Sequence, residues 1–117
     1  MNFEYNGNLL EDERINLVAK EIINAYPDIT LSKAKEAAML EGKISEKVTS
    51  KDKLDRLYNI MLVTSENKNI VSKIYPDFLK LLKETQTEDL ELYLKIAKVI
   101  NDFLEKKSEF PYVSDFE

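Results

Sequence analysis

The stretch from Leu90 to Leu104 constrains the fold of this chain more than any other part of its sequence. Ten of its fifteen residues are apolar, and the five polar ones follow one narrow helical stripe: Glu91, Lys95, Lys98, Asn101 and Asp102. A helix that is apolar over most of its circumference must be covered by several neighbouring elements. We therefore expect a helix over residues 88–107 to be either the central element of a helical bundle or a subunit interface.

Capping residues and the helical spacing of apolar side chains predict four further helices, at about residues 9–26, 31–41, 51–66 and 76–85. Asn8 and Thr30 are expected N-caps, and Thr49 with Asp52 has the spacing of a capping box. Gly42 is placed for a left-handed C-cap. Residues 43–50 are predicted as a loop with one helical turn, although their spacing also fits a strand-like connection.

Two Tyr-Pro-Asp sequences, residues 26–28 and 75–77, are interpreted as junctions between helices. A proline in a helix interior lacks a backbone donor and costs about 3 kcal/mol. We therefore expect a kink or a break at Tyr75. A break is favoured, with a new helix that begins at Pro76, because proline suits a first helical turn.

The two ends of the chain are predicted to be non-helical. In residues 1–8, apolar residues alternate with polar ones before the turn-forming pair Asn6-Gly7, which favours a short extended arm. Residues 108–117 form an aromatic tail that either folds back on the bundle or docks into another protein. Its candidate partner-binding residues are Phe110, Tyr112, Val113 and Phe116.

These patterns predict an all-α fold. A chain of 117 residues suits one core, so we expect a single domain over residues 1–117. In this prediction residues 1–8 are the arm, residues 9–107 are a bundle of about five helices, and residues 108–117 are the tail.

The composition removes most catalytic chemistry. The chain contains no Cys, no His and only two Gly, so it offers no thiol nucleophile, no usual zinc ligands and no glycine-rich phosphate loop. We therefore predict no catalytic, cofactor-binding or metal-ligating residues. No apolar stretch is long enough to span a membrane and the start of the chain lacks a basic signal sequence, so a cytoplasmic location is expected.

The net charge of −5 argues against nucleic acid as the main partner. Five basic residues do gather between positions 43 and 56, but Glu46, Asp52 and Asp55 interrupt them. A solvated helical face explains this stretch better than a nucleic-acid interface.

Glu88-x-x-Glu91 and Asp102-x-x-Glu105 resemble the paired acidic motifs with which nucleotide pyrophosphohydrolases of the MazG type hold magnesium. Both pairs would lie on one helix, about 20 Å apart at 1.5 Å per residue, so they could converge only across an antiparallel dimer. A carboxylate-metal hydrolase assembled in this way is one alternative function. The other interpretation is that these carboxylates simply meet the helix ends and solvent.

The stretch Leu54 to Glu84 contains Leu57-Tyr58-Asn59, followed by Asn67-Lys68 and an amphipathic helix. It resembles the third and fourth helices of enterocin-type bacteriocin immunity proteins. The resemblance covers about a quarter of the chain, and it implies a bacteriocin immunity-type helical protein as a second alternative.

We expect a non-enzymatic protein–protein interaction domain, a small cytoplasmic adaptor, inhibitor or accessory protein of a bacterial, phage or plasmid type. Its partner is another protein, or a second copy of the chain bound through the helix at residues 88–107.

Overall fold

The structure is a computed structural model that describes residues 3–41, 49–85, 90–106 and 109–110, with side chains from residue 12 onward. These ranges contain five helices and no strand: α1 (Phe3–Ala25), α2 (Leu31–Leu40), α3 (Ser50–Val63), α4 (Lys68–Glu84) and α5 (Leu90–Leu104). The predicted all-α bundle is confirmed.

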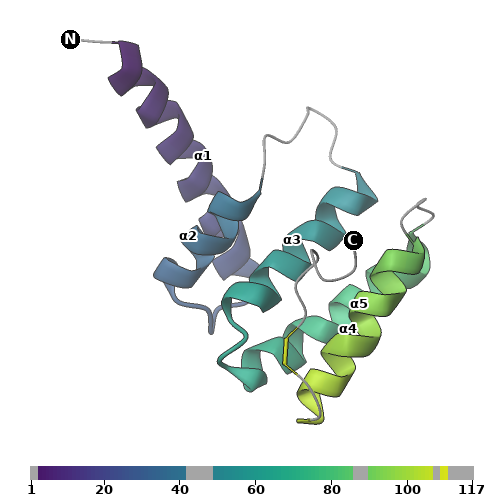
Figure 1. Ribbon diagram of the computed structural model, residues 1–117. Coiled ribbons are helices and arrows are strands. Elements are labelled where there is room, and N and C mark those ends of the chain that lie inside the picture. Colours follow the sequence, from purple (N-terminus) through teal and green to yellow (C-terminus); the bar gives the residue numbers. More distant parts are fainter. Residues whose placement is uncertain (1–2, 42–48, 86–89, 107–108, 111–117) are drawn as a thin grey trace.

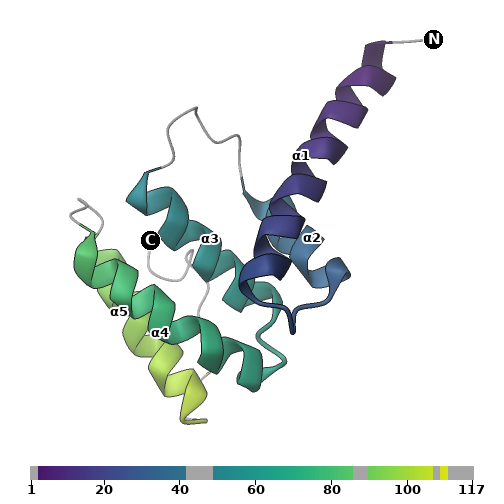
Figure 2. The same ribbon diagram turned by 180° about the vertical axis from the view of Figure 1, so that it is seen from behind.

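The helices pack in chain order, each against its neighbours in the sequence. Figure 1 shows α3 between the α1–α2 hairpin on one side and the α4–α5 pair on the other, and Figure 2 shows the same order from behind. α1 has 23 residues and α2 has 10, which correspond to lengths of about 35 and 15 Å. The first turns of α1 therefore project beyond α2, and the molecule is 53 Å long and 25 Å thick.

The predicted extended arm is wrong, because α1 begins at Phe3 and runs through Gly7 and Asn8. Adding residues to an existing helix gains one hydrogen bond per residue, whereas starting a helix is unfavourable. The helix formed by residues 9–25 therefore extends readily toward the N-terminus. A glycine inside it costs only about 1 kcal/mol, so Gly7 does not stop it.

The predicted caps of α2 and α3 are confirmed. The Thr30 side chain accepts a hydrogen bond from the Lys33 amide at 3.2 Å. At the start of α3, the Thr49 hydroxyl oxygen accepts from the Asp52 amide, while the Asp52 carboxylate accepts from the Thr49 amide. These hydrogen bonds hold the pKa of Asp52 below its ordinary value. Residues 42–48 and Thr87 lie outside the described residues, and with them the predicted Gly42 cap and most of the predicted loop.

The expected break at Tyr75 does not occur, since α4 continues through Pro76. Four buried side chains lie on one face across the proline: Val71, Ile74, Phe78 and Leu82. Burying each contributes about 1.5–3 kcal/mol, so keeping them aligned outweighs the roughly 3 kcal/mol that an interior proline costs. Pro76 itself is exposed, as is Ser72, whose carbonyl loses its helical partner and can be solvated instead.

The core lies mainly between α3, α4 and α5. Its largest fully buried side chains are Ile22, Leu54, Ile60, Met61, Val71, Ile74, Phe78, Ile96 and Ile100. Phe78 and Tyr93 place their rings 6.3 Å apart between α4 and α5. The Tyr93 hydroxyl donates to Asp55 and so also connects α5 to α3.

α5 lies at the edge of the bundle instead of at its centre. It buries one face against α4, but the Leu94 side chain is 54% exposed and Leu90 is 37% exposed. The expectation that neighbouring helices cover this helix on most of its circumference is therefore wrong. Of the two alternatives that its apolar sequence allowed, only the subunit interface is still open.

Two substitutions on α5 test its position. Ile96→Ala should lower the free energy of unfolding by about 2–5 kcal/mol, because it leaves a cavity in the core. Leu94→Ala should change it by less than about 0.5 kcal/mol, because that side chain is exposed. Urea denaturation of both variants measures the difference, and a large loss for Leu94→Ala would contradict the edge position of α5.

Candidate functional site

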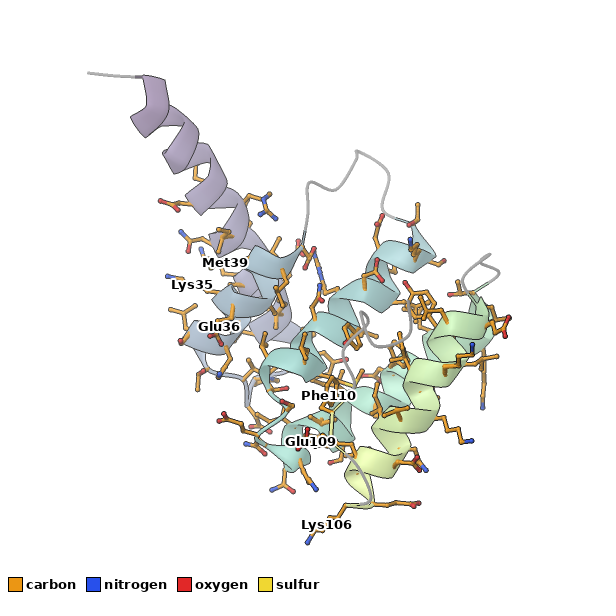
Figure 3. The ribbon with its side chains drawn as sticks, viewed as in Figure 1. Lys35, Glu36, Met39, Lys106, Glu109 and Phe110 are labelled. Carbon is orange, nitrogen blue, oxygen red and sulfur yellow. The ribbon has the colours of Figure 1, made fainter. Side chains whose placement is uncertain are left out.

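The aromatic tail begins inside the core. Phe110 is buried, with its ring 5.9 Å from that of Tyr58 and 5.4 Å from that of Phe103. Figure 3 shows Phe110 directed at the bundle. Of the four candidate partner-binding residues, Phe110 thus packs into the chain's own core. Tyr112, Val113 and Phe116 lie outside the described residues, and their docking role stays a prediction.

Large apolar side chains are exposed on α2. Leu31, Met39 and Leu40 are 53%, 65% and 52% exposed, and all three come from one helix of ten residues. Figure 3 shows Met39 pointing away from the bundle beside Lys35 and Glu36. This feature was not predicted from the sequence, where the alanine face is the clearest pattern in α2. We call Leu31, Met39 and Leu40 the α2 apolar residues.

The face of α2 opposite Met39 is made of small residues. Ala34, Ala37 and Ala38 are buried against α1 and α3. Side chains of this size let three helices approach closely, and they leave the larger residues of α2 to face solvent. The exposure of Met39 and Leu40 follows from this packing, because the alanines occupy the inner face. Leu31 is exposed at the first position of the helix.

A small pocket lies where the turn between α1 and α2 meets α4. It has a volume of about 170 Å³ and is lined by Ala25, Tyr26, Pro27, Asp28, Ile29, Ile70 and Lys73. The Lys73 ammonium forms an ion pair with the Asp28 carboxylate, and both side chains are largely exposed. We call this hollow the α1–α2 pocket.

The two Tyr-Pro-Asp sequences meet beside this pocket. The Tyr26 hydroxyl of the first donates to the Asp77 carboxylate of the second at 2.7 Å. Burial and this negatively charged acceptor raise the pKa of Tyr26 well above its ordinary value. Only the first sequence stands at a helix junction, because the second lies within α4. Its Tyr75 hydroxyl instead donates to the Ala97 carbonyl and links α4 to α5.

Arg56 joins three helices through two carboxylates. Its Nε and Nη2 atoms donate to both oxygens of Glu41, at 2.8 and 3.0 Å, and its Nη1 donates to Glu21 at 2.8 Å. The hydrogen bonds to Glu41 are the main cause that raises the pKa of Arg56. All the charges are paired with one another, so the cluster is a structural clamp that offers no open position for a ligand.

The acidic side chains of α5 do not converge within one chain. Glu91 and Asp102 lie on the same helix, about 16 Å apart at 1.5 Å per residue, and Glu88 is outside the described residues. Nowhere in the described part of the chain do three or more Asp or Glu side chains gather in a way that could hold a metal ion. The hydrolase alternative would still need a second subunit.

The basic stretch does not form an uninterrupted positive surface in its described part. Arg56 is engaged by Glu41 and Glu21, and Asp52 and Asp55 lie on the same helix. Lys43 and Lys47 lie outside the described residues. Within those residues, none of the five helices combines the length and the hydropathy that a membrane-spanning segment needs.

Comparisons with protein-family models, with curated proteins and with solved structures found no match for this chain. The resemblance of residues 54–84 to bacteriocin immunity proteins therefore stays a prediction.

The Arg56 clamp is testable by substitution. Arg56→Met should lower the free energy of unfolding by about 3 kcal/mol, because it leaves the Glu41 carboxylate buried without its partner. Glu21→Gln is the matched control. The Glu21 side chain is 63% exposed, so this change should cost less than about 1 kcal/mol. Chemical denaturation measures both variants, and equal losses would contradict the clamp.

The hydrogen bond from Tyr26 to Asp77 predicts a pH dependence. The folded state holds the Tyr26 proton more tightly than the unfolded chain, so the bond stabilises fully below the ordinary tyrosine pKa. Its contribution should fall as the pH rises above about 10, because the unfolded tyrosine then ionises first.

Tyr26→Phe should cost about 1 kcal/mol at neutral pH. The stability difference between the wild type and this variant should shrink at alkaline pH. Denaturation curves at about pH 7, 10 and 11 measure it, and a difference that does not change with pH would count against the bond.

Proposed function

We propose that this chain is a non-enzymatic protein-binding domain, a small cytoplasmic adaptor, inhibitor or accessory protein of a bacterial, phage or plasmid kind. The observation that carries the proposal is the exposure of the α2 apolar residues. Single exposed apolar residues are common on soluble proteins, but Met39 and Leu40 are adjacent, and Leu31 is exposed on the same ten-residue helix.

The surroundings of these residues support a contact with protein. Met39 and Leu40 are adjacent, and the charged residues Lys35 and Glu36 stand one turn before them on the outer side of α2. An apolar centre beside charged residues is the usual composition of a protein–protein interface. The alanine face fixes α2 against α1 and α3, so a partner would meet a helix that is already in place.

The test is capture of a partner from the native cell with two matched variants. The double variant Met39→Glu, Leu40→Lys changes the surface of α2 and leaves the net charge unchanged. Leu90→Glu with Leu94→Lys makes the same exchange on α5. We expect the wild type and the α5 variant to capture the same protein, and the α2 variant to lose it, with melting temperatures within a few degrees of the wild type.

Two results would contradict the proposal. Retention of the partner by the α2 variant would show that another surface binds it. If the wild-type chain captures no protein, the proposal that it is a protein-binding domain is rejected. If the captured protein is a receptor or a toxin, its identity also decides whether the immunity-type alternative holds.

A second copy of the chain is the other candidate partner, favoured by the exposure of Leu90 and Leu94 on α5. Burying these leucines across a two-fold axis would explain why the helix is apolar beyond the face that packs on α4. Sedimentation equilibrium of the wild type and of Leu94→Lys separates the cases. A dimer that the substitution dissociates supports this interface, and a wild-type monomer at high concentration rejects it.

The hydrolase alternative predicts stabilisation by a metal ion. A magnesium or manganese site formed across a dimer would raise the melting temperature at millimolar metal, because binding to the folded state stabilises it. An unchanged melting temperature would exclude this enzyme.

A further inference from the structure

The α1–α2 pocket offers an apolar interior of defined size. Its walls include Ala25, the rings of Tyr26 and Pro27, and the side chains of Ile29 and Ile70. Ile29 is almost fully buried, so the pocket has a firm base that continues into the core. An apolar cavity of about 150 Å³ can hold a benzene molecule. The 170 Å³ of this pocket therefore suit one leucine- or phenylalanine-sized group.

The polar groups at the pocket favour a cation beside that group. Lys73 and Asp28 are paired at the edge, and Asp77 adds a second carboxylate through its bond with Tyr26. The three ionised groups sum to one negative charge. Lys73 and Asp28 are 61% and 62% exposed, so their ion pair contributes little and Asp28 can turn to another cation.

We infer that the α1–α2 pocket receives an apolar side chain of a partner protein, with a basic residue of the partner next to it. This inference rests on the proposed function and names a contact point for it. A peptide fits better than a free amine, because Pro27 and Asp28 in the pocket lining are exposed, and a partner's backbone can also make contact there. The net charge of −5 gives the whole molecule the same preference for a basic partner.

Capped dipeptides are suitable probes, used with the full ¹⁵N-labelled chain. We expect acetyl-Leu-Lys-amide to give saturable amide shifts confined to residues 25–29 and 70–73. Acetyl-Leu-Glu-amide should bind severalfold more weakly, because it brings a negative charge to Asp28 and Asp77. Acetyl-Gly-Lys-amide should not saturate, because it has no apolar side chain for the pocket.

Two variants identify the site. Ala25→Leu adds bulk at the pocket and should abolish the shifts caused by acetyl-Leu-Lys-amide, while amides elsewhere stay in place. Asp28→Asn leaves the apolar walls intact, so it should keep binding but reduce the preference for the Lys dipeptide over the Glu dipeptide. The second variant keeps the test decisive if the first disturbs the fold.

Three outcomes would overturn the inference: shifts that do not saturate, shifts that Ala25→Leu leaves unchanged, or equal binding of the Lys and Glu dipeptides. Free isoamylamine that binds as tightly as acetyl-Leu-Lys-amide would assign the pocket to a small amine instead of a protein. If the dipeptides do not bind but the partner is captured through α2, only the contact at the pocket is rejected. If the dipeptides bind but the wild-type chain captures no protein, the binding site in the pocket is supported and the proposed function is rejected.

Discussion

The packing of α2 between α1 and α3 is the constraint on which the rest of the structure depends. Ala34, Ala37 and Ala38 are all buried, so the helix can approach both neighbours closely. Arg56 reinforces the junction, since it reaches Glu21 on α1 and Glu41 at the end of α2 from its own place on α3. A larger residue at any of the three alanines would overpack this junction and push the α1–α2 hairpin away from the bundle. The place of the hairpin then determines both surfaces proposed for binding: the outer side of α2, and the pocket between the turn and α4.

Packing in chain order leaves apolar residues at both ends of the molecule. α1 is covered chiefly by α2, and α5 chiefly by α4. No further element in the described part of the chain covers the outer sides of α2 or α5, where Met39, Leu40 and Leu94 are each more than half exposed. Exposed apolar side chains of this size are the ones that a contact with another molecule would bury. Phe110 at the start of the tail behaves differently, because its ring packs between those of Tyr58 and Phe103.

Features that depend on residues close in the sequence were predicted correctly. Features that depend on tertiary packing were not. The caps at Thr30 and Thr49 each use a hydrogen bond to the amide three residues later, so the spacing of residues in the sequence was enough to predict them. The predicted break at Tyr75 was wrong, because the buried row from Val71 to Leu82 outweighs the local cost of Pro76. The central position of α5 was wrong because an apolar sequence does not say whether neighbours exist to cover it. The α1–α2 pocket could not be predicted at all, since it joins residues about 45 positions apart, although the repeated Tyr-Pro-Asp sequence marked both of its sides.

α2 presents apolar side chains to solvent from a fixed position, and the reactivity of two methionines measures this exposure directly. Met39 on α2 is 65% exposed, whereas Met61 on α3 is fully buried. Dilute hydrogen peroxide converts accessible methionine to the sulfoxide, which mass spectrometry locates by residue. In the purified protein, Met39 should oxidise much faster than Met61, and Met61 should react only under conditions that unfold the chain. Equal protection of both methionines would mean that α2 is covered, and it would contradict this account.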